Sequence, residues 1–459
     1  AILAFYEARG FAPMWVAQGQ WTRKAQAALA RLARAGDDGL DLSAYSPPSP
    51  KGDKPAAALA DLRLAEAIVA YGRQASGGRV DPGRVSALIT VTPETARVEA
   101  ILTAVSAAAD PGEAVLAFNP PHPGYKALRA KLIELRQERP ATAEPPPRIP
   151  LGPTLRIGMR DPRVPLIRSR FGLDAPPTEA NGDLVYDTRI ASAIADFQRA
   201  NGLPASGTLT PRTIAALSGG EPSRLENEIV ANMERWRWLP RDLGADRVEV
   251  NIPDFTLKVT DDGQVTHRAR VVVGKPDTPT PVFSDEMKFL IVNPYWNVPP
   301  SIIKKEMEPN LAADPDYYTR RGYEVIRKGN QTIIRQPPGE RNALGRIKFM
   351  FPNRHAVYLH DTPSRSLFGT ERRAYSHGCV RVDQPFKLAE AVLGKERGWS
   401  EDRVRRMIGG AERTVHLARP LPVHIQYFTA FVDDHGKLQL RDDIYGYSRR
   451  LKGAMGLEN

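Results

Sequence analysis

The sequence contains a single cysteine, Cys379, in the run Tyr-Ser-His-Gly-Cys-Val-Arg-Val at 375–382. A lone thiol forms no disulfide within the chain, so it is either a small packing residue or a reactive group. The run is polar and glycine-bent, which makes it a poor core segment, and His360 lies nineteen positions earlier. A thiol with an imidazole base and nearby backbone N–H groups can transfer acyl groups. The pattern therefore predicts a cysteine acyltransferase.

His360 closes a short apolar run, 357–360, which we expect to form a strand. From a strand end the imidazole can reach a loop-borne thiol and remove its proton, and either the backbone or the side chain of Asp361 is expected to orient the other ring nitrogen. A developing oxyanion needs N–H donors, which we expect from His377, Gly378 and Cys379. The His377 side chain is either a second polar support or a structural hydrogen bonder.

A zinc site is the alternative chemistry for this region, because several side chains of the types that bind zinc fall close together in the sequence. These are His355, His360, Asp361, His377 and Cys379. Their spacing matches no zinc signature, so we expect no zinc site.

A β-rich domain is expected to position these residues. Val248, Val250 and Ile252 alternate with polar residues, as do the apolar residues of 255–259, and Asp-Asp-Gly at 261–263 is typical of a hairpin turn. Further strands are expected at 270–273, 288–292 and 356–359. Residues 301–343 interrupt this pattern with charged, Pro- and Gly-containing sequence, which makes them a candidate lid beside the site.

The rest of the chain predicts a multidomain α+β protein. Residues 1–139 contain apolar residues at helical spacing and are expected to form a helical scaffold domain. A Pro-rich linker follows at 140–153. Residues 154–219 are expected to form a small helical domain, with a helix over 188–200 and another that begins at Pro211 after the N-cap Thr210. The catalytic domain is then assigned to 220–459.

Composition narrows the possible partners. The net charge is +11, but basic and acidic residues are interleaved and no nucleic-acid-binding motif is present, so no nucleic acid partner is expected. No run of about 18 apolar residues predicts a membrane span. The first residue, Ala1, predicts a trimmed or mature fragment, which leaves room for an export signal or a membrane anchor upstream.

The chain resembles the L,D-transpeptidases with a YkuD-type catalytic domain. Their signature is a histidine followed, after an excursion, by Ser/Thr-His-Gly-Cys, a hydrophobic residue and Asn or Arg, and His360 with 376–381 fills it. The runs at 293–300, 344–349 and 358–363 resemble the larger, YcbB-like subgroup. By the same resemblance 1–139 is a scaffold domain and 154–219 a peptidoglycan-binding-like domain.

The resemblance implies a specific reaction. The Cys379 thiolate would attack the third residue of a tetrapeptide stem, a diaminopimelate, release D-Ala, and pass the acyl group to a second diaminopimelate as a 3→3 cross-link. It also implies a substrate pocket beside the thiol, a capping role for 301–343, a periplasmic location, and inactivation by carbapenems. The residues assigned to the pocket are Trp296, Tyr358, Ser376 and Arg381.

Two other functions stay open at this point. The same thioester chemistry with water as the acceptor would make an L,D-carboxypeptidase or endopeptidase, and a lipoprotein lysine is a further possible acceptor. A wall-binding scaffold with an inert site is the third class. A pocket role for Arg381, pairing with a stem carboxylate, also competes with a fold-stabilising ion pair.

Overall fold

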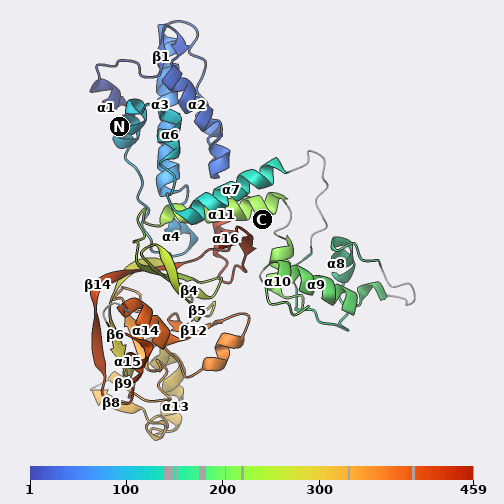
Figure 1. The fold of residues 1–459 in the computed structure, drawn as a ribbon, viewed down its shortest axis with the longest axis vertical. Helices are drawn as coiled ribbons and strands as arrows, with labels where there is room; N and C mark the ends of the chain where they lie inside the picture. The colour runs from blue at the N-terminus through green and yellow to red at the C-terminus, as the bar shows by residue number, and fades with distance from the viewer. Residues whose placement is uncertain are drawn as a thin grey trace. The chain divides into compact units, whose positions relative to one another are not determined.

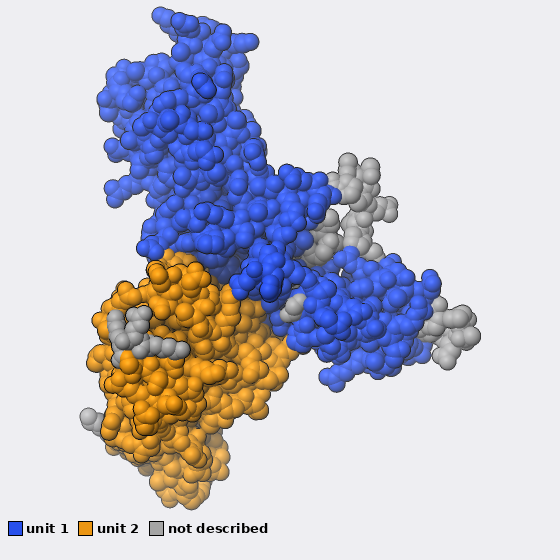
Figure 2. Space-filling view, viewed as in Figure 1, with its two compact units in different colours: residues 1–87, 91–242, 428–459 blue, residues 88–90, 243–427 orange. Residues whose placement is uncertain are grey.

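The computed structural model describes residues 1–138, 149–150, 152–174, 182–201, 203–218, 222–328, 331–394 and 398–457. The chain divides into two compact units, coloured separately in Figure 2. Unit 1 comprises 1–87, 91–242 and 428–459, and unit 2 comprises 88–90 and 243–427. Within the described residues no helix combines the length and the apolar character needed to cross a membrane.

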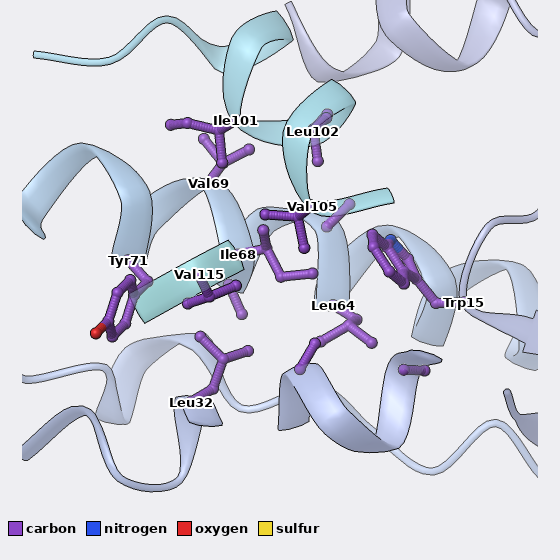
Figure 3. Packing of buried hydrophobic residues seen from close by; sticks show 14 of the residues in the cluster. Trp15, Leu32, Leu64, Ile68, Val69, Tyr71, Ile101, Leu102, Val105 and Val115 are labelled. Atoms are coloured by element: carbon purple, nitrogen blue, oxygen red, sulfur yellow. The ribbon is translucent and has the colours of Figure 1, made fainter. Parts of the chain in front are cut away.

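Unit 1 begins with the predicted helical scaffold. Its longest helix, α3 (Lys54–Gly77), starts where the Asp53 carboxylate caps the N–H of Ala56 and ends at Gly78, whose φ is 85°. Buried side chains of α3 pack against Trp15 and against α5, as Figure 3 shows. The other elements of the scaffold are α1 (Ile2–Glu7), β1 (Val16–Ala17), β2 (Gln20–Trp21), α2 (Arg23–Leu32), α4 (Pro82–Val85), α5 (Val98–Ala107), α6 (Pro111–Leu116) and α7 (Pro123–Gln137).

A second, separate core lies within 149–217, in the region predicted as a small helical domain. It is built from α8 (Val164–Arg170), α9 (Thr188–Ala200) and α10 (Pro211–Ser218). The bounds of α9 are those predicted, and the Thr210 hydroxyl accepts the N–H of Thr213 at the start of α10, as an N-cap should. Most of the predicted Pro-rich linker, 140–153, lies outside the described residues.

The prediction of one catalytic domain over 220–459 differs from the division of the structure. The helix α11 (Pro222–Trp238) and everything after Tyr427 belong to unit 1, because the C-terminal segment packs on α11: Phe428 stacks on Trp236 at a centroid distance of 4.6 Å. That segment contains β15 (Ala430–Val432), β16 (Leu438–Leu440) and α16 (Tyr447–Met455). Conversely, 88–90 joins unit 2, where Ile89 pairs with Val282.

Unit 2 is built on one nine-stranded sheet in the order β12-β5-β13-β11-β10-β6-β14-β3-β4, in which β4 also pairs with β5 and so closes the sheet on itself (Figure 1). Most pairs are antiparallel, but β11 runs parallel to β13. The strands are β3 (Arg247–Asn251), β4 (Thr256–Asp261), β5 (Gln264–Gly274), β6 (Phe283–Val292), β10 (Ile347–Met350), β11 (Leu359–His360), β12 (Ala374–Ser376), β13 (Val380–Val382) and β14 (Arg413–Gln426), with the helices α14 (Pro385–Leu393) and α15 (Glu401–Arg405).

The predicted hairpin turn is confirmed: Asp262 and Gly263 link β4 to β5 with φ values of 47° and 74°. The strand predicted over 356–359 is wrong, because β11 contains only Leu359 and His360. Ala356 has a φ of 51°, and the Asn353 side chain bonds the carbonyl oxygens of Phe351 and Val357, so this segment forms a tight turn instead.

The insertion at 301–343 has a small core of its own. It contains the short helices α12 (Pro300–Ile302) and α13 (Glu308–Ala313), joined by one π-helical stretch, Ile303–Met307. A three-stranded sheet in the order β7-β9-β8 completes it, with β7 (Trp296–Asn297), β8 (Glu324–Lys328) and β9 (Gln331–Gln336). Its core is formed by buried side chains of Val298, Ile303, Met307, Tyr318 and Ile334.

Candidate active site

Three charged or titratable side chains lie in one row across neighbouring strands of unit 2. Lys348 on β10 is the register partner of His360 on β11, and His360 is in turn the partner of Arg381 on β13. Directly paired residues project from the same face of a sheet, so the imidazole lies between two cations. Cys379 immediately precedes β13, the strand that pairs with that of His360.

His360 is held in one tautomer. Its Nδ1 lies 2.5 Å from the carbonyl oxygen of Asp361, and because a carbonyl oxygen only accepts, Nδ1 carries the proton and Nε2 keeps its lone pair. The ring is buried, and this burial, together with the charges of Arg381 and Lys348, lowers the pKa of His360 to about 3. The imidazole is therefore neutral at physiological pH, as a general base must be.

Either the backbone or the side chain of Asp361 was expected to orient His360, and the hydrogen bonds distinguish the two. The backbone oxygen makes the bond, whereas the carboxylate accepts the N–H groups of Arg346 at 2.8 Å and Thr362 at 2.6 Å and pairs with Arg365. The adjacent Gly345 has a φ of 62°, and a Cβ built there would lie 2.3 Å from the Asp361 carboxyl carbon. The side chain of Asp361 thus fixes the turn that carries the acceptor.

The loop before Cys379 is held by its own hydrogen bonds. The Ser376 hydroxyl accepts the N–H of Gly378 at 3.1 Å and donates to the carbonyl oxygen of Cys379. The Gly378 N–H is thus engaged within the loop, which differs from its expected role as an oxyanion donor, and Ser376 closes this turn rather than facing a pocket. Gly378 itself has a φ of 117°, a conformation that favours glycine.

A second set of hydrogen bonds to this loop comes from the loop after β5. The buried Thr280 hydroxyl donates to the carbonyl oxygen of Gly378 at 2.8 Å and accepts the N–H of Gly274 at 2.9 Å. The nucleophile loop is therefore tied to the sheet on the side away from β11, which limits how far Cys379 can move.

Cys379 is half-buried, and its Sγ lies 3.9 Å from the carbonyl oxygen of Ala356. Burial raises the pKa of the Cys379 thiol, whereas the backbone N–H of Tyr358 and the charges of Lys348 and Arg381 lower it. The resting group is accordingly a protonated thiol that requires a base, beside cations that favour its thiolate form.

The His377 side chain points toward the insertion. Its Nε2 lies 2.7 Å from a carboxylate oxygen of Glu306, which belongs to the π-helical stretch. Two roles were considered for His377, and a bond of this kind is the one expected of a structural hydrogen bonder. The bond links the insertion directly to the residue two positions before the thiol.

The remaining pocket residues differ in their surroundings. Tyr358 is half-buried beside the thiol, and its ring packs edge-on against Phe351 at 5.9 Å. Trp296 instead packs against the core of the insertion, with its ring 6.4 Å from that of Tyr323. Trp296 is only half-buried, and its expected place in the substrate pocket stays a prediction.

Two residues of this region were not predicted. Lys348 lies between apolar neighbours in a strand, but only the register with His360 reveals where its charge acts. Glu306 sits in a charged stretch of the insertion, and nothing in the sequence pairs it with His377. For the zinc alternative, no group of three or more potential ligands is arranged around a common point in the described part of the chain.

The depressed pKa of His360 predicts a pH-dependent stability. The unfolded imidazole, with its ordinary value of 6.5, gains a proton as pH falls from 6.5 toward 3, whereas the folded one does not. The free energy of unfolding of unit 2 should therefore fall as pH falls through this window, by up to about 1.4 kcal/mol per pH unit from this residue. Hydrogen exchange of β10, β11 and β13 in the full chain at pH 5 and pH 7 measures it.

The control for this prediction is His360→Asn, which cannot take up the proton. Burial also lowers the pKa of His267, His355 and His424, so part of the slope will persist in the variant. Identical slopes in the wild-type and variant proteins would contradict the assignment.

Family profiles match three parts of the chain. Residues 245–416 match the L,D-transpeptidase catalytic domain (YkuD), residues 1–132 match a scaffold domain, and residues 169–217 match a peptidoglycan-binding domain. The catalytic match lies entirely within unit 2 and ends before the C-terminal segment.

Individual proteins to which the chain is similar are named as L,D-transpeptidases. A curated Haemophilus influenzae protein named as an L,D-transpeptidase is 33% identical over 250 residues, which are 50% of this chain and 50% of that protein. The chain thus spans about half the length of this relative. Among solved structures, an L,D-transpeptidase from Mycobacterium smegmatis is 16% identical and covers 40% of this chain and 58% of its own, with a TM-score of 0.22. L,D-transpeptidase 3 from Mycobacterium tuberculosis is 16% identical, covering 40% and 61%, with a TM-score of 0.23. TM-scores this low carry no structural argument.

Proposed function

Because residues 245–416 form an L,D-transpeptidase catalytic domain of the YkuD type, we propose that this protein is a cysteine-dependent L,D-transpeptidase acting on peptidoglycan stems. The observation that carries the proposal is the tautomer of His360. Its Nδ1–H is bound to the Asp361 carbonyl, so a neutral Nε2 with a free lone pair belongs to a residue of β11, whose neighbour β13 begins directly after Cys379. This is the arrangement that a thiol nucleophile needs for activation.

In the first half-reaction, Nε2 of His360 takes the thiol proton while Sγ of Cys379 attacks the carbonyl carbon of the diaminopimelate at position 3 of a tetrapeptide. The tetrahedral intermediate carries its negative charge on the former carbonyl oxygen, for which the backbone N–H groups of His377 and Cys379 are the proposed donors. Its collapse breaks the bond to D-Ala, whose nitrogen takes the proton from the imidazolium. A Cys379 thioester remains.

In the second half-reaction, the side-chain amine of a diaminopimelate on another stem attacks the thioester. His360 accepts the proton that this amine loses and returns a proton to the departing sulfur, so the enzyme is regenerated and a 3→3 cross-link is formed. Atoms and charges balance without a metal or an organic cofactor.

Recognition of the stem is proposed for groups flanking the thiol. Arg381 has a buried Nε with no hydrogen-bond partner, and its side chain lies next to His360 in the row. A guanidinium with a free donor suits a carboxylate of the stem. Tyr358, half-buried next to the thiol, supplies an apolar wall.

The insertion is proposed to cap the bound stem. Support comes from the bond between Glu306 and His377, which fastens the insertion next to the nucleophile. The domain at 169–217 is proposed to hold the enzyme on its polymer, and a periplasmic location, with an anchor upstream of residue 1, is proposed because the stems are built into the wall there.

The deciding experiment supplies a purified disaccharide tetrapeptide with and without an amine acceptor and identifies the products by mass. Release of D-Ala together with 3→3 dimers is expected. Shortened monomers alone, in the presence of the amine, would identify a carboxypeptidase, and no release of D-Ala at all would identify an inert wall-binding protein.

A further inference from the structure

We infer that Lys348 is a positioning residue for the nucleophile: its ammonium group, fixed in the row with His360 and Arg381, stabilises the thiolate form of Cys379. The inference deepens the proposed function and rests on it only for the identity of the substrate. No proton leaves Lys348 in this role, since the thiol proton passes to Nε2 of His360.

The first argument is geometric. The strand register sets Lys348 directly opposite His360, and its Nζ lies 4.1 Å from the ring centroid of Tyr358. The backbone carbonyl oxygen of Tyr358 accepts the N–H of Val380, the residue after the nucleophile, at 3.0 Å. The ammonium group is therefore held against the ring of a residue whose backbone is paired beside Cys379.

The second argument is that no anion neutralises this ammonium. Among the described residues, no carboxylate lies within ion-pair distance of Lys348. The carboxylate whose charge acts on the pKa of Lys348 is that of Glu412, and it accepts the N–H of Tyr295. An aromatic face attracts a cation without cancelling its charge. Burying a lysine in this way costs free energy, so the charge at this position calls for a function.

The third argument is that His360 and Glu306 supply no positive charge to the thiolate. Many cysteine–histidine pairs stabilise their thiolate with an imidazolium, but burial and two neighbouring cations keep His360 neutral. On the insertion side, the acidic Glu306 is bound to His377. The groups whose positive charge acts on the sulfur are then Lys348 and Arg381, and the interaction between Lys348 and Cys379 is reciprocal.

The test uses the full chain and its single thiol, so that every thiol alkylation is at Cys379. Iodoacetamide alkylation is followed by intact mass as a function of pH for the wild-type protein, Lys348→Met and Lys348→Arg. For Lys348→Met we expect the profile to move to higher pH and the rate at neutral pH to fall about five- to tenfold, with Lys348→Arg restoring most of it. At a pH where the thiol is fully ionised, the rates should converge.

The matched control is Lys288→Met, which removes the same charge from an exposed position on the neighbouring strand β6 and should leave the profile unchanged. Lys348→Gln provides a second neutral variant if circular dichroism shows that Lys348→Met is misfolded. An unshifted profile in a folded neutral variant would overturn the inference, as would a loss confined to the high-pH plateau, which indicates blocked access. Because alkylation requires no stem peptide, a failure here is distinguishable from an absence of transpeptidation.

Discussion

Replacing Cys379 by alanine is expected to abolish D-Ala release from a tetrapeptide stem, with a loss of at least about 10⁴-fold. The substitution removes only a sulfur atom, which makes a long contact to the Ala356 carbonyl and one with the Tyr358 N–H, so the loop bonds made by Ser376 and Thr280 persist. Circular dichroism and thermal unfolding should therefore match the wild-type protein. Chromatographic detection of released D-Ala measures the effect.

A carbapenem provides an independent readout of the same variant. As the family resemblance implies, the wild-type protein should gain the mass of one opened β-lactam, because an activated thiol attacks that strained amide as it attacks a stem. Cys379→Ala should gain none. An adduct of unchanged stoichiometry in the variant would place the nucleophile at another residue.

Replacing His360 by alanine is expected to reduce D-Ala release by about 10³- to 10⁴-fold. Without Nε2, the thiol has no base, and its pKa is raised by burial. The measurement is the single-turnover rate of D-Ala release at neutral pH. His435→Ala removes an exposed imidazole from the turn between β15 and β16 and should keep full activity.

Alkylation separates a missing base from a distorted loop in the His360 variant. At a pH high enough to ionise the thiol unaided, His360→Ala should react with iodoacetamide as fast as the wild-type protein does. A variant that stays unreactive there has lost the geometry of Cys379, and the role of His360 would then be structural.

Periodic, local signals predicted much of the fold. The helix at 188–200 was bounded correctly because Asp187 caps it and its apolar residues recur at helical spacing. The alternating residues of β3 and the Asp-Gly turn before β5 were equally local signals. Cys379 and His360 could be proposed as site residues because the one thiol of the chain lies in a polar, glycine-containing run with a histidine nearby in the sequence.

The errors and omissions depend either on contacts between distant parts of the chain or on a backbone conformation that only the folded loop defines. Nothing local shows that the C-terminal segment packs on α11 through Phe428 and Trp236. The role of Lys348 depends on a strand register, and the hydrogen bond of Ser376 to Gly378 depends on a turn that only the folded loop defines. The shortened strand at β11 follows from an Ala356 conformation that alanine seldom adopts.

The acceptor that orients His360 is a peptide carbonyl, and this has a genetic consequence. A codon change at position 361 alters the side chain, but every amino acid, including proline, brings the same oxygen to the backbone. A point mutation at this position can change the orientation of that oxygen, but it cannot remove it. A drug that acylates the thiol would select resistant variants. Those that remain active should carry substitutions in the side chains that surround the sulfur and should keep the orientation of His360.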